Sequence, residues 1–197
     1  MAKPYDFKQV EADVLKLWKD NGIYQKAKDK NNDGKKFYFL QGPPYTSGSL
    51  HIGQSWNNSM KDIALRYRRM KGFDVWDRAG YDMHGIPTER KVMALQKIKF
   101  KNDIEKFGVE KFINECIKFS TGKAEEMNQD LIKLGVWMDF ENAYMPVKND
   151  FIEGEWFLVK RAHEQGRLYE GEKTLTWCPN CATAMAKHEC DYKEVED

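Results

Sequence analysis

The stretch that decides the fold covers residues 42–54 and reads Gly42-Pro43-Pro44-Tyr45-Thr46-Ser47-Gly48-Ser49-Leu50-His51-Ile52-Gly53-Gln54. An apolar segment at 37–40 predicts a strand before it, and a helix is predicted after it from His51 to Met70. Glycines let backbone approach a ligand, and a helix N-terminus offers unpaired N–H groups. We therefore expect a phosphate-binding loop, with His51 and Gln54 on one face of the first turn. The alternative is an ordinary loop in which His51 is a polar helix cap.

A second loop, at 78–89, follows a second predicted strand at 73–76 and carries Asp82 and His84 between two glycines. A strand, a helix and a strand at this spacing predict a right-handed βαβ unit. Ligands bind at the carboxyl ends of parallel strands, so the two loops should lie side by side. The Asp82 carboxylate could bind an ammonium group there, or it could cap amides in an Asx-type turn.

Further helices are predicted by apolar residues at helical spacing. The first is capped by Asp6, ends at Gly22 and has an apolar face that should be buried, made of Phe7, Val10, Val14, Leu17 and Trp18. Two helical stretches between 104 and 134 should be separated at Gly108. A later helix should end at Gly166 and bury Ile152, Trp156 and Val159, and segment 136–140 can supply a third strand.

The predicted fold class is α/β. It combines the βαβ unit with an N-terminal helix and further helices.

Composition limits the classes of partner. Lysine and arginine number 32 and aspartate and glutamate 31, so the net charge of +1 gives no sign of bulk nucleic-acid binding. The bases at the end of the second helix, Arg66, Arg68, Arg69 and Lys71, either complement the helix dipole or contact RNA phosphates. No apolar run is long enough for a membrane span, and no secretory signal opens the chain, so we expect a cytoplasmic protein.

The cysteines are unevenly spread. Cys116 lies on an apolar helix face and is expected to be a core residue. Cys178 and Cys181 have the spacing of half a zinc ribbon, and His188 and Cys190 could complete a tetrahedral site. The alternative is a set of reduced thiols without metal.

Several motifs occur in order and at matching spacing: the corner at 42–45, Leu50-His51-Ile52-Gly53, Lys61-Asp62, Arg66-Tyr67, Met70-Lys71-Gly72, and the loop from Gly80 to Glu89. Together they resemble the N-terminal part of a class I aminoacyl-tRNA synthetase of the subgroup that handles branched aliphatic amino acids. Among these, the isoleucyl enzymes fit best. Leucyl and valyl relatives are the alternatives, and the sequence His84-Gly85-Ile86-Pro87 disfavours them.

The resemblance implies the fold in more detail: the first half of a Rossmann-type parallel sheet with an N-terminal helix, a helical insert and a C-terminal zinc-ribbon-like β element. Residues 1–36 would form an N-terminal helical extension, 37–166 the N-terminal half of the catalytic domain, and 167–197 the start of a connecting module.

The resemblance also implies roles for matching positions. His51 and Gln54 would be catalytic, and both would bind ATP together with Gly48 and Gly53. The amino acid would be held by Gly42, Pro43, Pro44, Tyr45, Asp82 and His84, with Asp82 and the backbone at Gly42 on its amino group. The activity implied is that of an isoleucine–tRNA ligase. ATP with Mg²⁺ would form isoleucyl-adenylate, which would then react with tRNA(Ile). Zn²⁺ is a further implied cofactor, and a complementing C-terminal half is an implied partner.

The sequence departs from the family at three points. Gln54 replaces the second histidine of the His-Ile-Gly-His signature, and Gln41 stands where an aspartate is usual. The Lys-Met-Ser-Lys-Ser loop is absent, and the sequence stops at Asp197, about where an editing domain would begin. We therefore expect an N-terminal half of the catalytic domain with reduced or absent turnover. The alternative is a non-catalytic fragment that binds nucleotide or tRNA.

Overall fold

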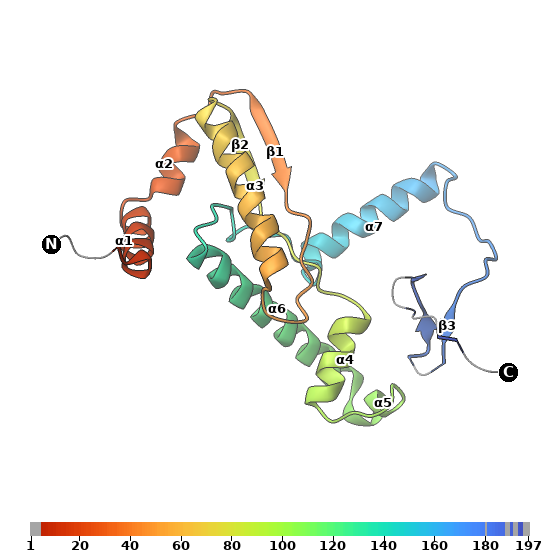
Figure 1. Ribbon diagram of the computed structural model, residues 1–197. Coiled ribbons are helices and arrows are strands. Elements are labelled where there is room, and N and C mark those ends of the chain that lie inside the picture. The colour runs from red at the N-terminus through yellow and green to blue at the C-terminus, as the bar shows by residue number, and fades with distance from the viewer. Residues whose placement is uncertain (1–4, 180, 188–189, 191–192, 195–197) are drawn as a thin grey trace. The chain divides into compact units, whose positions relative to one another are not determined.

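The computed structural model describes residues 5–179, 181–187, 190 and 193–194. The chain divides into two compact units, one made of residues 1–83 with 121–145 and the other of residues 84–120 with 146–197. The elements in chain order are α1 (Phe7–Asp20), α2 (Ile23–Asp29), β1 (Lys36–Leu40), α3 (Ile52–Met70), β2 (Asp74–Arg78), α4 (Ile86–Leu95), α5 (Asp103–Phe107), α6 (Val109–Lys133), α7 (Asn149–Glu164), β3 (Trp177–Cys178) and β4 (Thr183–Ala184), as Figure 1 shows. The protein is therefore α/β, as expected. The expected three-part division of the chain stays a prediction.

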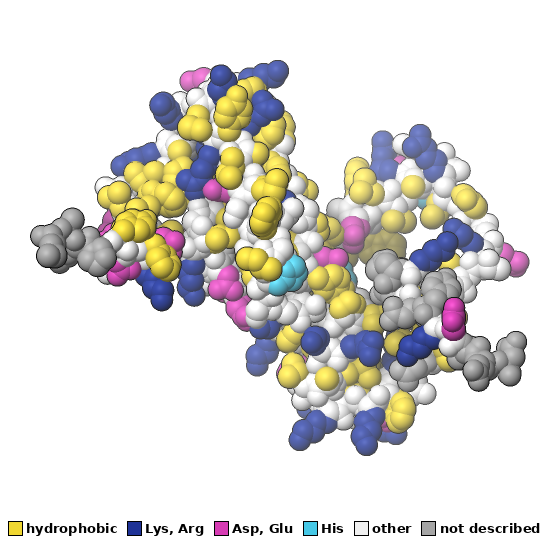
Figure 2. Space-filling model, viewed as in Figure 1, with side chains coloured by type: hydrophobic (Ala, Val, Ile, Leu, Met, Phe, Trp, Pro, Cys, Tyr) yellow, Lys and Arg dark blue, Asp and Glu magenta, His cyan; other side chains and the backbone are white. Residues whose placement is uncertain are grey.

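The centre of the first unit is the predicted βαβ unit. β1 and β2 pair in parallel from Lys36 opposite Asp74 to Leu40 opposite Arg78, and α3 connects them. Val75 and Asp77 of β2 are buried, whereas Tyr38 and Leu40 of β1 point outward and are 70% and 55% exposed. The alternation leaves one sheet face open within this unit. Hydrophobic side chains also reach the surface along α3, namely Trp56, Met60, Ile63, Tyr67 and Met70 (Figure 2).

The N-terminal helix has the predicted start but not the predicted burial. Asp6 Oδ1 accepts hydrogen bonds from the amides of Lys8 and Gln9, which confirms the cap. No residue of α1 is buried, however, and Phe7 and Leu17 are more than half exposed. The helix touches the rest of its unit mainly through Trp18, whose ring meets Trp137 edge-on at 5.1 Å between centroids. The prediction of a buried apolar face was wrong, because Phe7, Val10 and Leu17 are exposed and Val14 and Trp18 are only half-buried.

The third strand was also predicted wrongly. Residues 136–140 form no strand, because their hydrogen-bonding groups have other partners. The amide of Trp137 donates to Asp62 Oδ1 at 2.8 Å, and the side chain of Asp139 turns the chain by accepting from the amide of Asn142 at 3.0 Å. The segment bonds the chain just after β2 through Asp139 O, which accepts from the amide of Ala79 at 3.1 Å.

The bases at the end of α3 contact protein groups. Arg66 Nε donates to Asp62 at 2.6 Å, and its guanidinium lies 3.9 Å from the ring centroid of Trp137. Arg69 is buried and donates to Asp77 at 2.7 Å. These two side chains therefore stabilise the unit, which disfavours the RNA-binding interpretation of the cluster for them.

The second unit has its own small core. Val92, Ile104 and Phe112 are buried together, and Cys116 packs against them. Cys116 is half-buried at the edge of this core, so the expectation of a core cysteine is met in part. Burial raises the pKa of its thiol to about 11, with smaller contributions from nearby glutamates. Gly108 separates α5 from α6, as predicted. In α7, by contrast, no residue is buried and Trp156 is 67% exposed, so the predicted buried face was wrong.

Within the described residues, no helix combines the length and the apolar character that crossing a membrane requires.

Candidate functional site

His51 and Gln54 hold each other at the start of α3. His51 is the N-cap: its Nδ1 accepts from the amide of Gln54 at 3.4 Å, and Gln54 Oε1 accepts from the amide of His51 at 3.1 Å. This reciprocal pair is a capping box, in which glutamine is a usual second residue. Because Nδ1 is the acceptor, the neutral imidazole carries its proton on Nε2. His51 is therefore a polar cap, as the alternative had it, and still presents an exposed N–H donor.

The two glycines of this loop differ in what they allow. A Cβ at Gly53 would lie 3.2 Å from two atoms of the His51 ring, so glycine lets that ring fold over the first turn. A Cβ at Gly48 would meet nothing within 4 Å. The space beside Gly48 is therefore open, which is what a loop that accepts a ligand requires.

The two predicted loops lie side by side. Tyr45 and Asp82 form an isolated parallel bridge. The amide of Thr46 donates to Asp82 O at 3.0 Å, and the amide of Asp82 donates to Pro44 O at 2.9 Å. The Asp82 amide is thus used between the loops rather than in a turn of its own. Gly42 and Pro43 are exposed beside this pairing, and Pro44 and Tyr45 are half-buried. His84 is exposed and belongs to the second unit.

A buried chain of amides joins the loops to α3. Gln41 is 2% exposed, and its Nε2 donates to Asn58 Oδ1 at 2.7 Å, while its Oε1 accepts from the amide of Gly80 at 3.4 Å. Asn58 in turn donates to Gln54 O at 2.8 Å. A carboxylate at position 41 could accept but not donate, so the amide suits this network. The sequence showed Gln41 as a departure, but nothing in it pointed to Asn58 as its partner.

Tyr144 is a neighbour of the second loop that sequence reasoning missed. Its carbonyl accepts from the amide of Tyr81 at 3.2 Å, and its ring occupies the place where a Cβ of Gly80 would be. Burial, and then the charge of Asp82, raise the pKa of the Tyr144 hydroxyl. A tyrosine some 60 residues later in the chain carries no local signal that it will lie here.

Two residues of the cysteine cluster, Cys178 and Cys181, lie on the β3–β4 hairpin, and Cys190 follows it. The amide of Cys181 donates to Cys178 Sγ at 3.4 Å, so the turn brings these two residues together. Cys190 donates through its thiol to Ala186 O at 3.6 Å. His188 lies outside the described residues. In the part of the chain that the structure describes, no group of three or more His, Cys, Asp or Glu side chains could hold a metal.

Comparison with known proteins gives the same family that the motifs suggested. A model of the class I tRNA synthetases for I, L, M and V matches residues 13–197. The chain belongs to this family. Isoleucine–tRNA ligases of Pyrococcus abyssi and Methanocaldococcus jannaschii are each 46% identical to this synthetase chain over 198 residues. The alignment covers 99% of this chain and 19% of each relative.

A solved synthetase shares the fold. The LeuRS AgnB2 of Agrobacterium radiobacter K84, crystallised as a ternary LeuRS–tRNA–LeuAMS complex, superposes with a TM-score of 0.70 at 26% identity. The match covers 94% of this chain and 22% of that one. The synthetase chain thus spans about a fifth of the length of the relatives that it matches.

Proposed function

We propose that the chain is the part of an isoleucine–tRNA ligase that binds ATP and isoleucine, and that the activity is formation of isoleucyl-adenylate followed by transfer to tRNA(Ile). One observation carries the proposal: the loops 42–54 and 80–83 are bonded to each other at the carboxyl ends of two parallel strands. The names of the relatives support the amino acid.

The proposed chemistry is an in-line displacement. A carboxylate oxygen of isoleucine would attack the α-phosphorus of ATP, forming a P–O bond, while the bond to the bridging oxygen breaks and pyrophosphate leaves. Negative charge grows on the phosphate oxygens in the transition state, so a fixed donor beside them lowers the barrier. The exposed Nε2–H of His51 and the open space beside Gly48 suit this role. Mg²⁺ would arrive on the phosphates of ATP, since it usually binds through substrate phosphates and few protein ligands.

Isoleucine would sit at the second loop. The half-buried Asp82 carboxylate would pair with its ammonium group beside the exposed backbone of Gly42. Pro43, Pro44 and Tyr45 would line one side of the pocket. His84, two residues after Asp82, is also assigned to the amino acid by the resemblance.

The test is a titration of the 197-residue chain with ATP–Mg²⁺ and with isoleucine, alone and together, followed by isoleucine-dependent ATP–pyrophosphate exchange. Saturable binding of both ligands is expected, with valine and leucine binding more weakly. A missing methylene is worth only about 1–3 kcal/mol, a limit usually illustrated by the discrimination of isoleucine from valine in this enzyme family. A preference for leucine or valine would overturn the assignment to isoleucine.

The second candidate is a module that binds nucleotide or tRNA without catalysis. It is favoured by Gln54, which supplies an amide where the family has a second imidazole. Binding of ATP without any pyrophosphate exchange, both in the chain and after addition of the C-terminal remainder of a relative as a separate polypeptide, would support it. Exchange that appears on adding that remainder would support the ligase and the complementing partner. As part of the ligase proposal, we also propose that the protein is cytoplasmic.

We further propose a zinc ion on the β3–β4 hairpin. Cys178 and Cys181 fit half of such a site, because their spacing and the bond from the Cys181 amide to Cys178 Sγ place two soft ligands on one turn. Zinc would lock that turn. Elemental analysis should give about one zinc per chain. It should fall in Cys178→Ser and stay unchanged in Cys116→Ser. A wild-type content below about 0.2 per chain would reject the site.

A further inference from the structure

Helix α6 bonds both substrate loops through neighbouring residues. From the first loop, Ser49 Oγ donates to Glu126 Oε1 at 2.5 Å. From the second, the hydroxyl of Tyr81 donates to Asn128 Oδ1. All four residues belong to the first unit, and Figure 1 shows α6 passing the end of α3 at which the first loop enters.

Each of the two acceptors on α6 is itself held in place. Lys123 Nζ donates to Glu126 Oε2 at 2.5 Å, which leaves Oε1 for Ser49. Asn128 Nδ2 donates to Glu125 Oε2 at 3.2 Å, which turns Oδ1 toward Tyr81. The Ser49 contact is exposed, whereas Tyr81 is 0% exposed and Asn128 5%. The first bond is therefore open to solvent, and the second is part of the core.

The two loops carry different parts of the proposed site. Ser49 lies between Gly48 and His51, where the ATP phosphates would bind, and Tyr81 precedes Asp82, which would pair with the amino acid. The loops also bond each other through Thr46 and Asp82. Helix α6 therefore adds a bond to each of two loops that are already bonded to one another. A helix is stiff along its axis, so two acceptors on it fix the separation of the groups that they hold.

We propose that Glu126 and Asn128 are positioning residues that set the spacing of the ATP loop and the amino-acid loop from one helix. The proposal rests on the proposed function for the identity of the ligands. The bond from Ser49 to Glu126 acts on ATP, and the bond from Tyr81 to Asn128 acts on isoleucine. Neither α6 residue touches a substrate.

The test uses the full 197-residue chain and variants that remove one bond each. Glu126→Ala removes the acceptor of Ser49, and Glu126→Gln keeps an acceptor oxygen and should rescue. Tyr81→Phe removes only the hydroxyl that Asn128 holds. Glu110→Gln, an exposed acid near the start of α6, is the matched control. Hydrogen exchange of peptides covering 45–51 and 80–83 reports loop order without any ligand.

The expected result is a split between the ligands. Glu126→Ala should speed exchange in 45–51 and weaken ATP–Mg²⁺ binding about five-fold, while isoleucine binding stays unchanged. Tyr81→Phe should speed hydrogen exchange in 80–83 and weaken isoleucine binding about five-fold, while ATP–Mg²⁺ binding stays unchanged. A purely structural role would weaken both ligands alike.

Failure of this proposal differs from failure of the proposed function. If the unmodified chain binds neither ATP nor isoleucine, the proposed function fails, and hydrogen exchange of the two loops then decides the positioning role on its own. Hydrogen exchange in 45–51 that is the same in Glu126→Ala as in the control overturns the positioning role. Equal weakening of both ligands, or no rescue by Glu126→Gln, also overturns it.

Discussion

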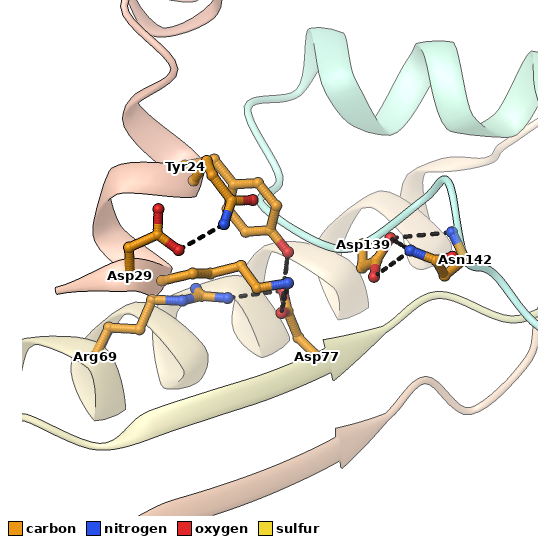
Figure 3. A network of polar contacts seen from close by, with 8 residues as sticks. Tyr24, Asp29, Arg69, Asp77, Asp139 and Asn142 are labelled. Carbon is orange, nitrogen blue, oxygen red and sulfur yellow. Dashed lines mark hydrogen bonds and ion pairs between the residues drawn. The ribbon is translucent and has the colours of Figure 1, made fainter. Parts of the chain in front are cut away.

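Asp77 offers the sharpest test of how the first unit is held together. Its carboxylate is buried in the sheet and accepts from Arg69 Nη2 at 2.7 Å and from the hydroxyl of Tyr24 at 2.9 and 3.0 Å (Figure 3). Lys28 Nζ lies 4.0 Å away. The contact joins α2, α3 and β2, so it connects the N-terminal extension to the strand that leads into Asp82.

Removing one charge of this pair should cost much more than removing both. Asp77→Ala leaves the Arg69 guanidinium buried without its partner, which typically costs about 3–5 kcal/mol. Tyr24→Phe removes one hydrogen bond to a charged group and should cost about 1.5–3 kcal/mol. Among the described residues, Arg69 Nε and Nη1 have no hydrogen-bond partner, so the pair is incompletely satisfied. Replacing both charges, as in Asp77→Leu with Arg69→Met, in a Tyr24→Phe background leaves no hydroxyl without its acceptor. That variant should therefore be within about 1 kcal/mol of the Tyr24→Phe protein or more stable.

The measurement is urea unfolding followed by circular dichroism and tryptophan fluorescence, with the m-value checked for constancy. The control is Asp20→Ala, which breaks the exposed ion pair of Asp20 with Lys16 and should change the free energy of unfolding by less than about 0.5 kcal/mol. A cost below about 1 kcal/mol for Asp77→Ala would refute the reasoning, since it would mean that Arg69 finds water or another partner. So would a double variant as unstable as the single one.

Three further predictions concern other parts of the chain. The pKa of Cys116 in the folded protein, about 11 against an ordinary 9.0, lies above the unfolded value, so its contribution to stability is complete below pH 9 and lost as the pH rises to 11. Its alkylation at pH 8 should accordingly be slow in the folded chain and fast in urea, and equal rates would contradict this. Gly80→Ala would place a Cβ 1.8 Å from a ring carbon of Tyr144 and should lower the melting temperature, with partial recovery on adding Tyr144→Ala; an unchanged melting temperature would show that the ring moves freely. Gln54→His should raise isoleucine-dependent pyrophosphate exchange by up to about 10²–10³-fold, because it restores a donor that can carry charge; no gain in rate would exclude the loss of that donor as the cause of slow activation.

The sequence predicted the parts of the fold that depend on neighbouring residues. β1, β2, α3 and the Gly108 break follow from apolar periodicity and from helix-ending glycines, which act locally. Periodicity identified the apolar faces of α1 and α7 but not what covers them, and both faces are exposed in the structure. Segment 136–140 had strand-like composition, but Asp62, 75 residues earlier, takes the Trp137 amide.

In the candidate site, too, the sequence predicts some features and not others. That the loops after β1 and β2 would meet followed from the rule for parallel strands, and they do meet through Thr46 and Asp82. The contacts that fix them, from Asn58, Glu126 and Tyr144, come from segments whose sequences carry no sign of a partner. Side chains that position a loop from far along the chain need no motif, only a donor or an acceptor at the right place, so sequence pattern alone does not find them.

Position 54 shows why binding and turnover have to be tested separately. In the sequence, Gln54 stands where the family has a histidine, which indicates the loss of a side chain that can carry charge. In the structure its side-chain oxygen accepts from the His51 amide and so fixes the backbone there, while the backbone amide of the same residue donates to His51 Nδ1. The buried Gln41 network then holds the carbonyl of the same residue through Asn58. The two glutamines thus preserve the shape of the loop while removing ionisable groups from it. Under the proposed function, a loop of intact shape would bind ATP, whereas stabilising the charge that grows on the phosphate would fall to His51, so binding and turnover need separate assays.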